Sequence, residues 1–258
     1  MKRSSLPTSI VCPACSDTSE KGTITSKHSY DIFRCNYCGL EFVHPMPSPE
    51  QMDHFYRDYS NFRAEITVVE RNALRNIEHL KKFGLSSDSR LLDFGCGENI
   101  FVRKGKTKNW FGYDYYQKPD KQAISDFSGR NWDFITLWGV LEHLVNPRDQ
   151  IQELANSLTP QGVLALTTVT TESSIPYQFK PPEHVTYWTK KSVQVLFSAA
   201  GLSILEYKNY KMIQKADVYL SCVLRTVPEK FQRKISHSLP EYIEVPTNEI
   251  FVVGVKEQ

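Results

Sequence analysis

The chain has 258 residues and a mass of 29.7 kDa, and 40% of its residues are hydrophobic, which is enough for one full-sized core plus a small extra module. Its 31 basic and 29 acidic residues give a net charge of +2, which excludes the strongly one-signed field of a dedicated nucleic-acid or membrane-surface binder. The composition also excludes intrinsically disordered, collagen-like and disulfide-scaffold proteins.

No signal peptide is expected at the N-terminus. Residues 1–7 lack the apolar stretch of a signal peptide. No apolar run in the chain approaches the roughly 20 residues that a membrane-spanning helix needs. We therefore expect a cytoplasmic protein without a membrane partner.

Four of the six cysteines form two C-x2-C pairs with 19 residues between them: Cys12, Cys15, Cys35 and Cys38. Two such pairs present four thiolates to one tetrahedral Zn²⁺ ion, and their spacing is typical of a zinc ribbon. A disulfide pair is disfavoured in a reducing cytosol, and a C-x-x-C redox site explains one pair but not two. Because four cysteines leave no open coordination position, we expect structural zinc in a ribbon, residues 1–44, with a core separate from the rest.

A proline-rich segment, residues 45–49, marks a boundary after the ribbon. Apolar residues at helical spacing predict a helix over residues 64–83, which Gly84 ends. Residues 45–88 are therefore interpreted as a linker and helical lid region. In this region Tyr56 and Tyr59 either close over a pocket or pack against neighbouring side chains.

From residue 89 onward, short apolar runs alternate with helical stretches. Helices are expected after Asn146 and after Thr189. The buried strands are expected at residues 90–94, 110–113, 134–138, 162–168, 204–207 and 250–255. This alternation predicts an α/β fold with a doubly wound sheet. Ligands bind such sheets at the carboxyl ends of the strands, so the residues after each strand are the candidate site.

The first of these strands leads into Asp93-Phe94-Gly95-Cys96-Gly97. Glycines lack a Cβ atom and let the backbone approach a bulky ligand closely. A nicotinamide dinucleotide site needs a third glycine at position 100, where this chain has Ile100. The sequence D-x-G-x-G instead resembles motif I of the class I S-adenosylmethionine-dependent methyltransferases.

Further residues carry this resemblance. Asp114 ends the second strand, where a carboxylate can accept hydrogen bonds from both hydroxyls of a ribose. Residues 133–144 are similar to the family's segment after the fourth strand, and residues 158–162 to its turn before the fifth. The resemblance implies a Rossmann-like methyltransferase domain over residues 89–258. Its sheet would be mostly parallel with the last strand antiparallel, and it would bind S-adenosylmethionine.

The resemblance also implies a set of donor-binding residues. Asp126 and Phe127 are candidates for the adenine wall, although they also fit an ordinary loop. The connection after Asp114 is short, so this wall is expected to be abbreviated. The full set comprises Asp93, Gly95, Cys96, Gly97, Asp114, Tyr115, Asp126, Phe127, Trp138 and Glu142.

Two histidines are candidate bases for the transfer. The methyl group of a sulfonium is already activated, so positioning supplies much of the acceleration, but a hydroxyl acceptor still benefits from a base. His143 follows the fourth strand, and His184 lies between the fifth strand and the next helix, where this fold places acceptor loops. Each is also compatible with a histidine that hydrogen-bonds the backbone and shapes the pocket.

We therefore expect methyl transfer by in-line displacement to a small molecule. The ribbon resembles those fused ahead of methyltransferases that modify sugars or other small metabolites, which suggests a nucleotide-linked sugar or another hydroxylated metabolite.

Two alternative functions stay open. An RNA methyltransferase with a gripping ribbon is disfavoured, because residues 1–44 carry a net charge of only +1, from five basic and four acidic residues. The second alternative is a non-catalytic binding or assembly module that has kept the fold but no longer binds the methyl donor. The sequence does not indicate an oligomeric state.

Overall fold

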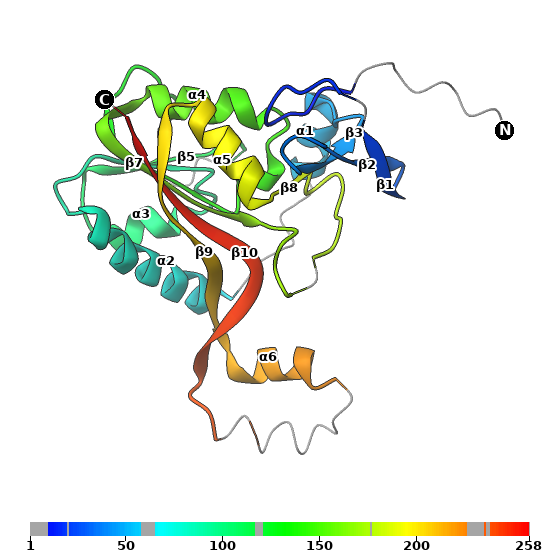
Figure 1. Ribbon diagram of the computed structural model, residues 1–258. Helices are drawn as coiled ribbons and strands as arrows, with labels where there is room; N and C mark the ends of the chain where they lie inside the picture. The colour runs from blue at the N-terminus through cyan, green and yellow to red at the C-terminus, as the bar shows by residue number, and fades with distance from the viewer. Residues whose placement is uncertain are drawn as a thin grey trace.

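The computed structural model of the protein describes residues 10–19, 21–57, 65–116, 121–175, 177–225, 235 and 238–257. Its strands form a four-stranded sheet in the order β1-β2-β3-β8 and a six-stranded sheet in the order β5-β4-β6-β7-β10-β9. Figure 1 shows the small sheet lying beside the large one. Among the described residues, no helix combines the length and apolar character needed to cross a membrane.

The large sheet has the predicted Rossmann-like form. Strands β4 to β7 pair in parallel, whereas β10 runs antiparallel to both β7 and β9. The bounds are β4 (Leu91–Phe94), β5 (Trp110–Tyr113), β6 (Trp132–Trp138), β7 (Leu158–Val169), β9 (Leu202–Lys215) and β10 (Tyr242–Lys256). The mostly parallel sheet with its last strand antiparallel is therefore confirmed.

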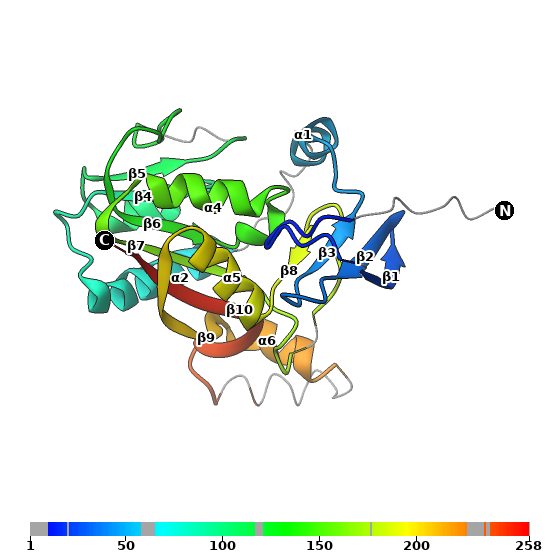
Figure 2. The same ribbon diagram turned by 45° about the horizontal axis from the view of Figure 1, so that its top comes forward.

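Helices cover both faces of this sheet (Figures 1 and 2). One hydrophobic cluster lies under α2 and α3, and a second lies under α4 and α5. The helical segments are α1 (Pro49–Arg57), α2 (Ile66–Leu80), η2 (Lys81–Phe83), α3 (Ile100–Gly105), η3 (Leu141–His143), α4 (Pro147–Asn156), α5 (Lys190–Ala199) and α6 (Ala216–Val223). Because β4 pairs with both β5 and β6, the winding reverses at β4, and a ligand site is expected at its carboxyl end.

Local sequence accounts for several element boundaries. The predicted helix over residues 64–83 is α2 followed by η2, and Gly84 ends it in a left-handed conformation. Thr189 and Ser192 form a reciprocal capping box at the start of α5. Asn146 precedes α4 without a side-chain cap hydrogen bond. Strands β9 and β10 extend beyond the predicted apolar runs, because the two strands continue to pair with each other.

The small sheet contains a strand from the second half of the chain. It consists of β1 (Gly22–Lys27), β2 (Tyr30–Arg34), β3 (Glu41–His44) and β8 (Thr186–Tyr187). Both views show β8 beside β3 (Figures 1 and 2), and Glu41 and Phe42 pair with it. The ribbon is thereby joined to the segment that follows β7.

The expectation of a separate ribbon core is wrong. One hydrophobic cluster contains Leu40 and Phe42 of the ribbon together with Trp188 and Val193 near α5. The Thr189 hydroxyl also donates to the Cys38 carbonyl over 3.0 Å. A module of about 40 residues buries little apolar surface by itself, and this ribbon completes its core against the larger domain. The predicted boundary at residue 44 stays a prediction.

Candidate active site and cysteine cluster

The loop after β4 places two glycines in left-handed backbone conformations. Gly95 has φ 74° and Gly97 has φ 50°. A Cβ atom on Gly95 would lie 2.6 Å from the Val140 Cγ2 atom, whereas a Cβ on Gly97 would meet no described atom within 4 Å. The first glycine is therefore needed for packing under the loop, and the second borders open space where a ligand can approach the backbone.

Asp114 lies beside this loop, directly after β5. Its Oδ2 accepts a hydrogen bond from the Gly97 amide at 2.8 Å, and its Oδ1 accepts one from the Tyr116 amide at 2.9 Å. A carboxylate offers about four acceptor positions, which is compatible with ribose hydroxyls binding alongside these amides. The two amides fix the orientation that such binding requires.

Asp93 and Cys96 lie beneath the loop surface. Asp93 is buried, and its Oδ1 accepts a 2.7 Å hydrogen bond from the Thr136 hydroxyl. Burial raises the pKa of Asp93 to about 7. The sulfur of Cys96 packs closely against Gly112, where a Cβ would lie 2.6 Å from it. These contacts support the loop from below.

Asp126 and Phe127 make local contacts. Asp126 is exposed and accepts hydrogen bonds from the amide and the hydroxyl of Ser128. The Phe127 ring is buried edge-on against Phe94 and Tyr113, with centroids 5.5 and 5.0 Å away. The adenine-wall role of this pair stays a prediction.

Tyr115 and Trp138 occupy contrasting positions. Tyr115 is 72% exposed. Trp138 ends β6 and packs against Phe101 and Phe251, with centroids 5.2 and 5.9 Å away. Its indole nitrogen is buried and has no hydrogen-bond partner within the described part of the chain. This leaves a buried donor unpaired at the carboxyl end of β6.

Glu142, His143 and His184 meet after β6. One ligand-type atom from each lies within 4.8 Å of the other two, and the two imidazole rings are perpendicular with centroids 4.8 Å apart. The Val185 amide donates to the Glu142 carbonyl over 2.8 Å. This backbone bond holds the residue 180–185 segment against η3. We call these three side chains the Glu-His-His cluster.

Hydrogen bonds orient the Glu-His-His cluster. His143 Nδ1 lies 2.8 Å from the Glu183 carbonyl oxygen and 2.9 Å from the Tyr56 hydroxyl. Because a carbonyl oxygen can only accept, Nδ1 carries the proton and Nε2 carries the lone pair. Glu142 Oε2 accepts a 2.8 Å hydrogen bond from the Thr168 hydroxyl.

Burial favours the uncharged forms of all three side chains in the Glu-His-His cluster. It lowers the pKa of His143, and it lowers the pKa of His184 to about 3. Burial also raises the pKa of Glu142 to about 7. Both imidazoles are therefore neutral at cellular pH, as either a base or a metal ligand must be.

Tyr56 connects α1 to both halves of the site. Its ring stacks on Tyr116, with centroids 4.6 Å apart, and its hydroxyl contacts His143. Helix α1 thus lies between the Asp114 loop and the Glu-His-His cluster. Tyr59, the other predicted lid residue, lies outside the described residues.

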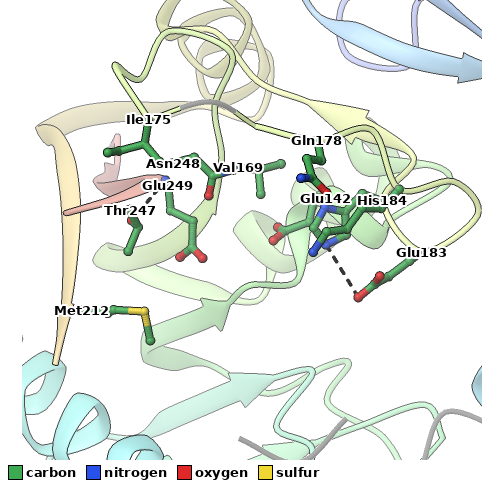
Figure 3. Close-up of a pocket in the computed structure, with 11 residues that line it drawn as sticks. Glu142, Val169, Ile175, Gln178, Glu183, His184, Met212, Thr247, Asn248 and Glu249 are labelled. Atoms are coloured by element: carbon green, nitrogen blue, oxygen red, sulfur yellow. Dashed lines mark hydrogen bonds and ion pairs between the residues drawn. The ribbon is translucent and has the colours of Figure 1, made fainter. Parts of the chain in front are cut away.

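A cavity of about 490 Å³ opens beside the Glu-His-His cluster. Figure 3 shows Glu142, Glu183 and His184 at one end and Thr247 and Glu249 at the other. Burial raises the pKa of Glu249 to about 7. The sequence did not indicate Glu249 or Glu183 as site residues. Glu249 comes from β10, and only the pairing of β10 with β7 brings it here.

The four predicted cysteines form a second cluster, in the ribbon. Cys12 and Cys38 have sulfurs 3.7 Å apart, those of Cys15 and Cys35 are 3.6 Å apart, and all four lie within 4.8 Å of one another. Disulfide sulfurs are about 2.05 Å apart. Four sulfurs about 2.3 Å from one zinc ion are about 3.8 Å apart. The cluster therefore has the dimensions of a tetrahedral zinc site with four thiolate ligands.

A family model described as a methyltransferase domain matches residues 62–207. No curated protein matches the chain.

Three similar solved structures share the fold. The structure titled the [4+2]-cyclase SpnF has 15% identity and a TM-score of 0.53, covering 83% of this chain and 98% of that one. A SAM dependent methyltransferase from Archaeoglobus fulgidus has 15% identity and a TM-score of 0.51, covering 79% and 100%. An S-adenosylmethionine-dependent methyltransferase from Clostridium acetobutylicum has 14% identity and a TM-score of 0.50, covering 80% and 99%. At these identities the likeness concerns the fold alone.

Proposed function

The chain belongs to the methyltransferase-domain family, and from this premise we propose that it transfers a methyl group from S-adenosylmethionine to a hydroxyl oxygen of a small molecule. The proposed acceptor is a nucleotide-linked sugar or another hydroxylated metabolite bound in the cavity. One observation carries the proposal. The cavity is lined by Glu142, which follows β6, by the segment after β7 that carries His184, and by residues of β9 and β10. The glycine loop and Asp114 follow the neighbouring strands β4 and β5 of the same sheet edge.

The donor is held by the loops after β4, β5 and β6. When bound, S-adenosylmethionine supplies a methyl group on a positively charged sulfur, ready for in-line displacement. Asp114 accepts the ribose hydroxyls, and the open backbone at Gly97 lets the donor approach. The indole N–H of Trp138, which is unpaired within the described part of the chain, is a further hydrogen-bond donor at the same edge of the sheet.

The acceptor's proton is taken by His143 or His184. His143 Nε2 carries the lone pair that this role requires, because Nδ1 donates to the Glu183 carbonyl. Burial lowers the pKa of both imidazoles, and it lowers that of His184 to about 3. Tyr56 and Glu183 fix the orientation of the His143 ring, and this fixed geometry favours His143 as the base.

The four cysteines bind structural Zn²⁺. Their spacing and mutual distances support this assignment. The ion would stabilise the ribbon, whose strand β3 pairs with β8, next to Val185, His184 and the cluster. In this way the ribbon contributes to positioning the acceptor loop.

The alternatives receive different support. No described feature favours RNA as the acceptor, and the ribbon uses its β3 edge to pair with β8. The similar structure titled a [4+2]-cyclase illustrates that one fold can carry different reactions. A chain that has lost methyl transfer is therefore the alternative that the experiment has to exclude.

The test is a screen of nucleotide-linked sugars and other hydroxylated metabolites with purified protein and S-adenosylmethionine. We expect one compound to gain the mass of one methyl group, with S-adenosylhomocysteine formed in equal amount. Calorimetry on the same protein should detect donor binding. Absence of donor binding at millimolar concentration would contradict the methyltransferase proposal and favour a binding or assembly role.

A further inference from the structure

We propose that Glu142, His143 and His184 bind one divalent first-row cation, such as Mn²⁺, Fe²⁺ or Zn²⁺, that coordinates the acceptor hydroxyl in the cavity. The inference rests on the proposed function and deepens it, because it gives the two imidazoles the role of ligands in place of that of a base. Two imidazoles and one carboxylate form a ligand set that holds such cations while leaving coordination positions open.

The distances allow a common cation. One ligand-type atom of each residue lies within 4.8 Å of the others. Two ligands about 2.1 Å from one cation are at most about 4.2 Å apart, and the 4.8 Å limit on the separations is close to this span. Glu142 is buried and both histidines are half-buried. Their surroundings therefore allow only small rotations of these side chains toward a bound cation.

Two of the three ligands, His143 and Glu142, have the kind of support that metal ligands have in known sites. Such histidines donate their second ring N–H to a carbonyl or carboxylate, and His143 Nδ1 lies 2.8 Å from the Glu183 carbonyl oxygen. Ligand carboxylates are likewise hydrogen-bonded, and Glu142 accepts from the Thr168 hydroxyl. The backbone bond from Val185 to Glu142 holds the two ligand-bearing segments together.

The cavity charges favour a cation over an anion. Among the described residues that line the cavity, the carboxylates are Glu142, Glu183 and Glu249, whereas Lys180 is the one lysine or arginine. Lys180 opposes a cation, but the oxygens of the three carboxyl groups supply more ligand atoms for a cation than the lining supplies positive groups. The cluster also borders the cavity (Figure 3), so the open positions of a bound cation would face the acceptor.

A bound cation would determine which functional group the methyl acceptor presents. A hydroxyl coordinated by a divalent cation is more acidic, because the positive charge stabilises the oxyanion. Its proton leaves to water, and the oxygen then forms a bond to the methyl carbon. The S–C bond breaks, and its electron pair stays on sulfur. The preferred acceptor thus presents a hydroxyl, or two adjacent hydroxyls, to the cluster.

Mn²⁺ is the probe of choice, because it prefers oxygen and nitrogen ligands over the thiolates of the ribbon. Full-length protein with its zinc content measured beforehand is titrated with Mn²⁺, and the signal of free Mn²⁺ is followed by electron paramagnetic resonance. We expect one bound Mn²⁺ per chain. Glu142→Gln and His184→Asn should each weaken binding by more than about 10-fold, and Thr168→Val by about 10- to 100-fold.

His28→Asn is the matched control. His28 lies in an exposed turn with φ 50°, a conformation that asparagine tolerates, and its replacement should leave Mn²⁺ affinity unchanged. No bound Mn²⁺ at millimolar concentration, or equal affinity in the wild type and the folded His184→Asn variant, would overturn the inference. Circular dichroism establishes that each variant is folded.

The two proposals fail in different ways. If a chelator removes the cation, leaves the zinc content unchanged and does not slow methylation of the identified acceptor, the cation inference is wrong and the proposed function stands. If the protein binds Mn²⁺ in the cluster but neither binds the donor nor methylates any compound, the proposed function is wrong and the metal site stands.

Discussion

The ribbon and the carboxyl edge of the large sheet each gather a cluster of metal-ligand residues, but in opposite ways. The four cysteines come from two short pairs in the first 38 residues, and three of the four are buried. The Glu-His-His cluster joins η3 to the loop before β8 and borders a cavity of about 490 Å³. A closed cluster can stabilise structure, whereas chemistry on a substrate requires open access.

The two regions also depend on each other. The ribbon completes its core against α5 and pairs β3 with β8. The residues directly before β8 carry His184 and the Glu183 carbonyl that orients His143. Loss of the closed cluster should therefore disturb the open one, while changes in the open one should leave the ribbon intact.

The largest effect is expected from Cys35→Ser, which removes one ligand of the closed cluster. Structural zinc sites contribute about 10–16 kcal/mol of apparent binding free energy at neutral pH, and the ribbon shares a hydrophobic cluster with the large sheet. We expect loss of zinc and a lower thermal unfolding midpoint for the whole chain. Zinc analysis and circular dichroism measure both.

Cys222→Ser provides the control, because Cys222 is exposed and lies outside the cluster. It should change neither zinc content nor the unfolding midpoint. If Cys35→Ser releases zinc while the large sheet unfolds at its original temperature, the stability of the sheet does not depend on the ribbon. The proposed coupling of the two regions would then be wrong.

In the open cluster, His143→Asn is expected to lower turnover by about 10²–10⁴-fold, because a proton acceptor or a ligand of the acceptor site is lost. Donor affinity should stay nearly unchanged, and the zinc content of the ribbon should be unaffected. Steady-state kinetics with the identified acceptor and donor calorimetry test this, with His28→Asn as the control. A raised Michaelis constant with little loss of turnover would instead indicate a positioning histidine.

Asp93 provides a pH test of the sheet edge. Burial raises its pKa to about 7 in the folded chain, whereas an unfolded aspartate titrates near 3.9. Between these values the folded state binds more protons, so stability falls as pH rises. From pH 5 to pH 8 the wild type should lose about 2–3 kcal/mol of unfolding free energy relative to Asp93→Asn.

Urea unfolding at the two pH values measures this difference. Asp88→Asn is the matched control, because Asp88 is exposed near the same strand and the variant retains Asp93, so it should keep the pH dependence of the wild type. Equal pH dependence of the wild type and Asp93→Asn would mean that Asp93 is not the buried titrating group.

The smallest effect is expected from Asp114→Ala, which should weaken S-adenosylmethionine binding by about 1–3 kcal/mol, because the ribose hydroxyls lose their acceptor. Its carboxylate also accepts the Gly97 amide, so Asp114→Asn, which keeps one acceptor oxygen, should weaken binding less. Calorimetry measures both affinities. Unchanged affinity in Asp114→Ala would remove this residue from the donor site and separate the glycine loop from ribose recognition.

Local sequence determined the features whose physics is local. The C-x2-C spacing predicted a cluster that is present with the dimensions of a four-thiolate zinc site, because each pair of ligands lies within one turn. Hydrophobic runs predicted the strands of the large sheet, and D-x-G-x-G predicted a methyltransferase, as the family match supports. Glycines, caps and apolar runs act over a few residues, so their consequences can be read along the chain.

Only the tertiary structure decided which distant residues meet. Glu249 reaches the cavity because β10 pairs with β7, and Tyr56 reaches His143 because α1 lies beside the Asp114 loop. The ribbon's shared core likewise depends on β8 and α5. Residues that are far apart in the sequence and share no motif have no characteristic spacing from which their contact could be predicted. Their meeting follows from how sheets, helices and loops bury apolar surface together, which no single segment specifies.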